Sequence, residues 1–514
     1  MTRGFDAIVV GSGLGGLTAG ALYARAGRRV LVLERNDSFG GAATVYRHNG
    51  LAIEASLHEI DGLDAGDPKL PLLHALGLDP ENDFVQVGDL HEMRGGLIGA
   101  PFALPHGIEA ARAATTRRFP HQAAALRTYF QWLTAIRGAV GFAAEHQDDR
   151  AWWLRHGAQS VHQLWPLVRH GRASVSEALR HLFGEDEAVK AALAGNLAYY
   201  HDDPGRMRFL HYAIPQASFL LGGGHCVRGG SQALADRLVS LIRAAGGVAE
   251  SGREVGALVM DRNRITGVGH SARGGGDAKV DTAPVVFGNA APQRLAEMLP
   301  EEWREIFLAP YQRRRLSISL WTLSVGLSRP AGEFGVTHYS NCIFPDWMRS
   351  IDAYREASAI LAEDSDDRLP PYVFVDYRRI ATGLNESGPF LGSFCGVDRV
   401  ENWADLRADQ KRGRRERWMD RLIGDLDRHF PGIAGAVVHR EMATAETMEQ
   451  YLNTPGGAVY GYAPDENLGE TLARSPATAI HGLWLASAFT MSGGYTGAML
   501  GGGAAARAAL RANG

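Results

Sequence analysis

The sequence predicts an α/β fold in which one sheet-forming domain is assembled from three separated segments, with an α+β domain inserted between them. Three observations lead to this prediction. Residues 5–34 contain an apolar run, a glycine-rich turn, a helix-sized stretch and a second apolar run, which is the pattern of a βαβ unit. Two further glycine-rich blocks occupy residues 221–230 and 482–498. The length of 514 residues exceeds what one hydrophobic core accommodates, so two domains are expected.

The glycine-rich turn after the first predicted strand indicates dinucleotide binding, because its glycines have separate physical roles. Gly11 permits the tight turn, Gly13 lets a pyrophosphate approach the backbone, and Gly16 lets the following helix pack on the strand. The backbone amides at the start of that helix would face the diphosphate. Glu34 ends the second apolar run, where its carboxylate would accept hydrogen bonds from ribose hydroxyls. The cofactor contacts predicted in this Rossmann-like unit are Gly11, Gly13, Leu14, Gly15, Gly16 and Glu34.

A second glycine pair indicates which dinucleotide this unit binds. Gly40 and Gly41 precede two alanines, so the backbone there can run close beside a long, extended cofactor. The pattern is similar to the extended fingerprint of FAD proteins, in which glutamate is the usual ribose ligand. Arg35 could suggest a 2′-phosphate, but the adjacent Glu34 would repel one, so Arg35 is expected at the surface beside the site. The predicted contacts of this stretch are Arg35, Gly40, Gly41 and Ala42.

The two later glycine-rich blocks are predicted to complete the FAD site. Residues 221–230 lead into a helix over 231–245, and a β-hairpin follows over 254–269. Near the end of the chain, a strand-like run over 482–490 leads into a small-residue helix over 498–509. The positive end of that helix would stabilise negative charge on the pyrimidine edge of a reduced flavin. The contacts predicted in these blocks are Arg228, which would contact a phosphate or close its loop, and Val255, Asn289, Ser487, Thr496, Gly497 and Ala498.

Composition and charge narrow the classes of function. The net charge of −4 and the lack of a dense basic tract argue against nucleic-acid binding. Cys226, Cys342 and Cys395 are far apart and fit neither a metal-binding spacing nor a disulfide framework, so we expect reduced thiols, no metal ion and a cytoplasmic location. The first strand begins almost at the first residue, so no signal peptide is expected, and no apolar run is long enough to span a bilayer.

Two segments are candidates for peripheral membrane contact. The helical pattern over 106–193 is rich in arginine and tryptophan, and its aromatic residues would lie either in the core or on a membrane surface. The segment 303–321 carries three consecutive arginines beside apolar residues, either as a solvated charge cluster or as a membrane contact. The helical tryptophans are Trp132, Trp152, Trp153 and Trp165. The FAD-binding domain is expected over 1–105, 222–300 and 441–514, and the substrate-binding domain over 106–221 and 301–440.

The chain resembles a known family in four of its blocks, which lie in the family's order and at its approximate spacing. They are the first glycine-rich unit through Gly41 and residues 225–234, 454–462 and 483–498. The family is that of the FAD-dependent phytoene desaturases, carotenoid isomerases and retinol saturases, which are relatives of the amine oxidases. The resemblance implies an FAD-dependent oxidoreductase that desaturates, saturates or isomerises carbon–carbon bonds of an apolar isoprenoid, carotenoid-like or retinoid-like substrate. Hydride transfer would take place at flavin N5.

The segment 53–60 departs from the desaturase pattern and contains the proton-transfer candidates. His58 is similar to the retinol-saturase branch, although Ala55 and Ser56 replace a small residue and a glycine there. His58 would be either catalytic or a structural histidine, and Glu59 is expected to be structural or exposed. Tyr495 would stack near the flavin or line the substrate tunnel.

Two alternatives stay open beside this reading. An amine-oxidase-type enzyme acting on a smaller polar substrate would need an aromatic cage, for which Tyr460, Tyr462 and Tyr495 are available. A flavin-binding protein with no turnover of its own would bind FAD tightly without redox chemistry.

Overall fold

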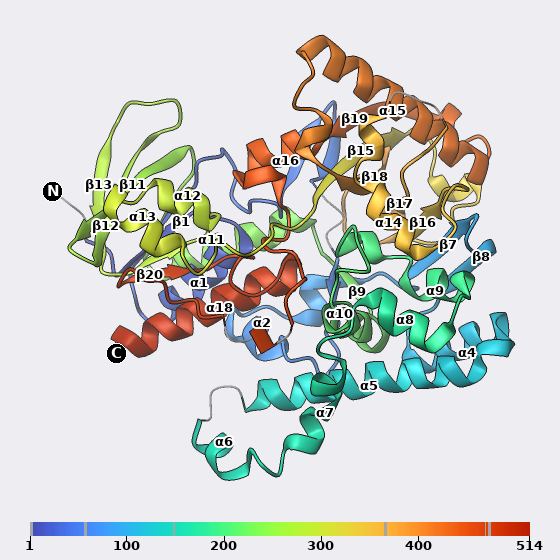
Figure 1. The fold of residues 1–514 in the computed structure, drawn as a ribbon. Coiled ribbons are helices and arrows are strands. Elements are labelled where there is room, and N and C mark those ends of the chain that lie inside the picture. Colours follow the sequence, from blue (N-terminus) through green and yellow to red (C-terminus); the bar gives the residue numbers. More distant parts are fainter. Residues whose placement is uncertain are drawn as a thin grey trace.

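The predicted α/β class is confirmed by the computed structural model, which describes residues 4–55, 59–146, 150–363, 367–467, 469–470 and 474–513 (Figure 1). A five-stranded parallel sheet has the order β10-β2-β1-β14-β20. Its strands come from the three predicted segments, so the cofactor-binding domain is discontinuous. They are β1 (Ala7–Val10), β2 (Val30–Leu33), β10 (Val248–Glu250), β14 (Val286–Gly288) and β20 (Leu483–Leu485).

Helices cover one face of this sheet and a small antiparallel sheet covers the other. Side chains alternate along β1, because Ala7 and Val9 pack into the helical core, whereas Ile8 and Val10 pack into the core beneath the small sheet. The helices are α1 (Leu14–Arg25), α11 (Ser231–Ala244) and α18 (Gly494–Asn513). The small sheet consists of β11 (Arg253–Asp261), β12 (Arg264–Ala272) and β13 (Lys279–Thr282).

The second domain is built on a seven-stranded mixed sheet with the order β19-β15-β18-β17-β16-β7-β8. Its strands are β7 (His91–Gly95), β8 (Gly99–Leu104), β15 (Ser319–Leu327), β16 (Ser340–Phe344), β17 (Tyr372–Asp376), β18 (Phe390–Asp398) and β19 (Val437–Ala443). Strands β7 and β8 fall within the segment 1–105 assigned to the cofactor-binding domain, yet β7 pairs with β16 and Met93 is buried in the core of the second domain. This pairing spans more than 240 residues of sequence, so no local pattern indicates it.

Helices cover both faces of the seven-stranded sheet. One long helix, α15 (Ala408–His429), buries Trp418 against one face, in a core with Trp321 and Trp403. The predicted helical insert packs around the other core. It contains α4 (Ile108–Arg118), α5 (Ala123–Glu145), α6 (Arg150–His156), α7 (Val161–His170), α8 (Val175–Phe183), α9 (Glu187–Ala194) and α10 (Phe209–Gly222).

Two small sheets lie between the domains. The hairpin of β3 (Val45–His48) and β4 (Leu51–Glu54) is held to the second domain by Asn385. The side chain of Asn385 accepts a hydrogen bond from the Ala52 amide (2.9 Å) and donates one to the Ala52 carbonyl (2.6 Å). The other sheet joins β5 (Ile60–Asp61), β9 (Gly224–Val227) and β6 (Phe84–Gln86). These sheets connect cofactor-binding segments to the substrate side of the molecule.

Candidate functional site

The glycine-rich turn and the second glycine pair converge to form a cradle at the carboxyl end of the parallel sheet. The backbone of Gly13 pairs with that of Gly40 in an isolated parallel β-bridge. A Cβ atom added to Gly41 would lie 3.1 Å from the Gly13 Cα. A Cβ on Gly13 would lie only 2.5 Å from the Nδ2 of Asn289. Among the described residues, no side chain caps the N-terminus of α1, so its first amides are available to an anion. The cradle fits a diphosphate, and four of the predicted residues form it.

Glu34 lies at the end of β2 beside this cradle. Its side chain is buried, and one carboxylate oxygen accepts hydrogen bonds from the Ser12 amide (2.8 Å) and the Ser12 hydroxyl (2.6 Å). The Arg253 amide donates to the Glu34 carbonyl at 2.7 Å, which places the start of β11 and the buried Val255 nearby. This arrangement puts a buried carboxylate next to an apolar residue at the end of β2.

The two arginines predicted to contact the cofactor donate hydrogen bonds to backbone carbonyls of other segments. Arg35 donates hydrogen bonds to the carbonyls of Gln450 and Tyr451, and burial lowers its pKa. Arg228 is exposed and donates to the Asn82 carbonyl at 2.9 Å. This hydrogen bond ties the loop after β9 to the segment before β6.

The start of α18 faces the same region from the third segment. The Thr496 hydroxyl donates to Asp61 at 2.6 Å, and the buried ammonium of Lys69 lies 3.4 Å from the same carboxylate. Lys69 and the Thr496 hydrogen bond lower the pKa of Asp61 against the effect of burial. Gly497 has no space for a side chain, because a Cβ there would lie 2.1 Å from the Ser492 carbonyl oxygen. Ser487 is also buried, and its Cα would lie 3.0 Å from a Cβ on Gly15.

All three chain segments meet at Glu54. Its buried carboxylate accepts hydrogen bonds from the Ser231 amide (2.9 Å) and hydroxyl (2.5 Å) at the start of α11. Burial raises the pKa of Glu54 to about 7. Tyr495 is buried beside this pair, and burial raises its pKa well above the usual value. Tyr495 therefore contacts the junction of the three segments.

Glu59 lies in the interior between the two domains. From the sequence we expected this residue to be structural or exposed. Burial raises the pKa of its carboxyl group to about 8. A Cβ on Gly224 would lie 2.6 Å from its Oε2, and among the described residues no group donates a hydrogen bond to it. The charge of Glu59 adds to burial in raising the pKa of Tyr199, Cys226 and Cys342. The other predicted proton-transfer residue, His58, lies outside the described residues.

Three tyrosines share this interior with Glu59. Tyr199, Tyr200 and Tyr460 have pKa values raised by burial, yet like Glu59 each retains some accessible surface. From this combination we infer that the four side chains line an internal space. We call the space bounded by Glu59, Tyr199, Tyr200 and Tyr460 the interdomain chamber. His225 lies on the neighbouring strand, and burial lowers its pKa to about 4, so it is neutral at physiological pH.

The aromatic cage considered for an amine substrate is not assembled by the three tyrosines. Tyr460 faces the interdomain chamber, but Tyr462 packs edge-on against Phe489 in the core below the small sheet. Tyr495 belongs to the helical core of the cofactor-binding domain. The three side chains therefore lie in three different environments.

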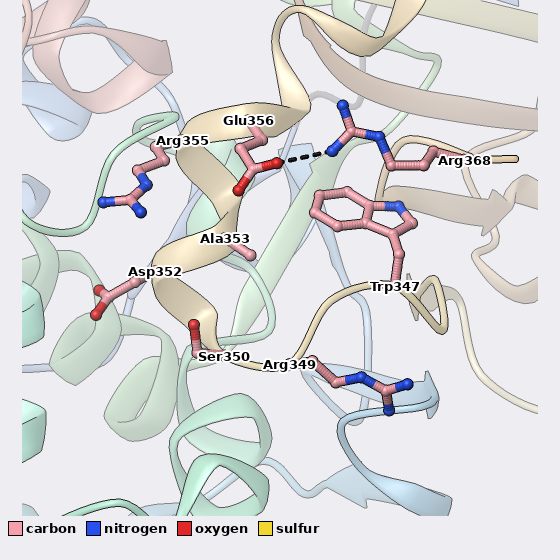
Figure 2. A pocket seen from close by; sticks show the side chains of 8 residues that line it. All are labelled: Trp347, Arg349, Ser350, Asp352, Ala353, Arg355, Glu356 and Arg368. Atoms are coloured by element: carbon pink, nitrogen blue, oxygen red, sulfur yellow. Dashed lines mark hydrogen bonds and ion pairs between the residues drawn. The ribbon is translucent and has the colours of Figure 1, made fainter. Parts of the chain in front are cut away.

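A surface pocket of about 410 Å³ lies on the second domain, away from the cradle residues (Figure 2). Glu356 and Arg368 form an ion pair of 2.7 Å across it, and Arg368 lies over the ring of Trp347. Arg349 and Arg355 point away from each other. This charged pocket does not suit an apolar substrate.

Comparison with known proteins agrees with this architecture. Residues 9–69 match the model of the NAD(P)-binding Rossmann-like domain. All-trans-retinol 13,14-reductase of Rattus norvegicus is 23% identical, and the alignment covers 99% of this chain and 86% of that protein. The lycopene-forming phytoene desaturase of Pseudescherichia vulneris is 25% identical over 89% of each chain. Cyclohexylamine oxidase from Brevibacterium oxydans IH-35A shares the fold, with a TM-score of 0.60, 15% identity and coverage of 99% and 98% of the two chains.

These comparisons confirm the resemblance stated from the sequence. The homologues of this chain include retinol reductases and phytoene desaturases, which are oxidoreductases, so the prediction of an enzyme of that class is also confirmed. The chain shares its fold with cyclohexylamine oxidase and with putrescine oxidase.

Proposed function

We propose that this chain is an FAD-dependent oxidoreductase that saturates, desaturates or isomerises carbon–carbon double bonds of an apolar isoprenoid of the carotenoid or retinoid class. The observation that carries the proposal is the extent of the match to retinol 13,14-reductases. Because the alignment covers 99% of this chain, it includes the substrate-binding domain as well as the Rossmann-like unit. A shared Rossmann-like unit alone would support only dinucleotide binding.

The described residues fit FAD as the bound dinucleotide. Glu34 would hold the ribose, the Gly13–Gly41 cradle the diphosphate, and the start of α18 the pyrimidine edge of the flavin. The bound flavin would supply a hydride acceptor or donor at N5. The buried contacts of Gly15 with Ala486 and Ser487 keep the first and third segments together at this point.

Glu59 is proposed as the proton donor or acceptor that accompanies hydride transfer. Saturation adds a hydride to one carbon and a proton to its neighbour, and desaturation removes both. With a pKa of about 8, Glu59 is mainly protonated at neutral pH, so it is prepared to donate. The surrounding tyrosines have raised pKa values and stay neutral, which leaves Glu59 as the titrating group among the described residues that line the interdomain chamber.

The experiment that tests this proposal follows the flavin absorbance of the purified protein under anaerobic conditions. We expect one FAD per chain, bleached by a carotenoid or retinoid that is oxidised, or reoxidised after dithionite reduction by one that is reduced. Bleaching by primary amines, with hydrogen peroxide formed in air, would instead establish the amine-oxidase alternative. Tight FAD binding without response to any polyene or amine would establish a binding protein without turnover.

We further propose that helices α6 and α7 make peripheral contact with an anionic membrane. They lie at the lower edge of the molecule (Figure 1), and Leu154 and Val168 have exposed fractions of 84% and 63%. Trp165 is 54% exposed. Residues 150–172 contain four arginines and no aspartate or glutamate, although the whole chain has a net charge of −4. Exposed apolar and aromatic side chains among cations are typical of helices that lie in the interface of an anionic bilayer.

The other candidate segment, 303–321, offers less apolar surface than its sequence suggested. Trp321 is completely buried in β15, and Arg315 forms an ion pair of 2.7 Å with Asp465. Arg314 lies 3.3 Å from Glu466. Among the described helices, none combines the length and apolar character required to cross a membrane.

A further inference from the structure

Two histidines and a glutamate meet where the β3–β4 hairpin contacts the edge of the seven-stranded sheet. His48 ends β3, whereas His439 and Glu441 lie on β19. One potential ligand atom from each of the three side chains lies within 4.8 Å of the other two. None of these residues takes part in the proposed cofactor site or in the interdomain chamber.

The local backbone explains why the three side chains converge. His439 and Glu441 are two positions apart on one strand, so they point to the same face of the sheet. Strand β19 is an edge strand, because it pairs with β15 and ends the strand order. The hairpin turn at Asn49 and Gly50, both with positive φ, sets His48 beside this edge.

The distances between the three potential ligand atoms are short enough for all three to bind one ion. His48 Nδ1 lies 2.7 Å from Glu441 Oε2, and His439 Nε2 lies 3.8 Å from the same oxygen. Two ligand atoms bound to a tetrahedral Zn²⁺ are about 3.4 Å apart, because each lies about 2.1 Å from the metal. These two separations fall on either side of that value, and the third pair of ligand atoms lies within 4.8 Å.

His439 independently indicates that this cluster can bind a ligand. Its side chain is only 11% exposed, and its Nε2 is buried without a hydrogen-bond partner among the described residues. A buried imidazole nitrogen is normally hydrogen-bonded or bound to a metal. The ring of His48 approaches His439 edge-on, with centroids 5.1 Å apart, so both imidazoles border the same small volume.

We propose that His48, His439 and Glu441 form a binding site for a divalent transition-metal ion of the Zn²⁺ type. Two imidazole nitrogens and one carboxylate oxygen form a ligand set suited to such ions, and they leave a fourth position for water. The ion would link the hairpin of the cofactor-binding segment to the edge of the substrate-domain sheet. This proposal does not depend on the proposed enzymatic activity.

The test is calorimetric titration of the EDTA-treated chain with ZnCl₂, together with thermal unfolding. We expect one Zn²⁺ per chain with a micromolar Kd, and a rise in Tm of about 2–4 °C at saturation. His439→Gln and His48→Gln should each weaken binding at least about tenfold. His74→Gln, which removes an exposed histidine on the distant segment 70–75, should bind like the unaltered chain.

Two results would overturn the proposal. The unaltered chain could show no saturable binding below millimolar Zn²⁺, in which case the cluster is only a His–Glu ion pair. Equal affinity in the unaltered chain and in both variants would place any bound zinc at another site. A circular dichroism spectrum of each variant establishes that the fold is retained.

Discussion

Glu59 is the residue on which the proposed chemistry depends most directly. Its carboxyl group is buried between two domains, and the neighbouring thiols and phenols do not ionise at neutral pH. We expect Glu59→Gln to lower kcat about 100-fold or more, because a positioned proton-transfer group contributes about 10²–10⁴ to the rate. FAD content should not change, since among the described residues no hydrogen bond or ion pair joins Glu59 to the cradle residues. Glu302→Gln, at an exposed position on the helix Glu301–Leu308, is the matched control.

The pH dependence of turnover distinguishes donation from acceptance of the proton. The pKa of Glu59 is raised to about 8 from its usual value of about 4.3. If Glu59 donates a proton in saturation, kcat is high below pH 8 and falls as the pH rises through that value. If it accepts a proton in desaturation, kcat rises through the same range. Steady-state pH profiles should show this limb in the unaltered chain and lack it in Glu59→Gln.

The substitution Gly13→Ala tests the cradle, because it adds a single methyl group there. A Cβ at this position would lie 2.5 Å from Asn289, on the surface where the diphosphate is expected. We expect the FAD content per chain of purified Gly13→Ala to be about tenfold or more below that of the unaltered chain. Flavin absorbance after denaturation measures this content. Gly138→Ala, whose Cβ would meet no atom within 4 Å, should retain full FAD. Full occupancy in Gly13→Ala would contradict the assignment of the cradle.

At the scale of elements, helices α1 and α18 approach each other through glycines. A Cβ on Gly502 would lie 2.1 Å from the Gly15 carbonyl oxygen, so a side chain there must move the backbone. We expect Gly502→Ala to lower the free energy of unfolding by about 2 kcal/mol, as overpacking does. Gly503→Ala should be neutral or stabilising by up to about 1 kcal/mol, because a Cβ there meets only side-chain ends and alanine favours the helix. Urea denaturation of both variants measures the difference.

The elements that the sequence predicted well are those specified by local patterns. The βαβ unit, the helix after Ser231 and the final small-residue helix depend on glycines and apolar residues within about 30 positions of one another, and all three are present. The position of Glu59 could not be predicted in this way. Strand β5 beside it pairs with β9, more than 160 residues later in the chain, and that pairing places Glu59 in the interior. The neighbours of Arg35 and Tyr495 likewise come from distant segments.

At the scale of the whole molecule, the membrane proposal concerns helices α6 and α7, which lie at its lower edge in Figure 1. We expect the chain to float with vesicles containing phosphatidylserine, and to float less with neutral vesicles, because residues 150–172 carry four arginines and no acidic residue. Replacing the two most exposed apolar side chains, Leu154→Ser with Val168→Ser, should reduce the floating fraction severalfold.

The exposed Ile306 provides a comparison on a different helix. Ile306→Ser alters a side chain that is 51% exposed within the segment 303–321, and it should float like the unaltered chain. Loss of flotation in Ile306→Ser alone would assign the contact to that segment. An absence of vesicle binding at low ionic strength would contradict membrane contact by either segment.

The organisation of the whole chain also explains how the proposed chemistry is kept from water. Three separated segments form the cofactor-binding domain, and β16 of the seven-stranded sheet lies beside the interdomain chamber, where Ser340 is hydrogen-bonded to Tyr199. The central claim is that this arrangement transfers hydrogen to or from an isoprenoid. The most direct measurement is chromatography with mass spectrometry of retinoids and carotenoids incubated with the FAD-loaded protein and a chemical electron donor or acceptor. We predict a product that has gained or lost two hydrogen atoms, or a geometric isomer, at a rate reduced in Glu59→Gln. Unchanged polyenes in every incubation, with amine-dependent peroxide formation by the same preparation, would contradict the claim.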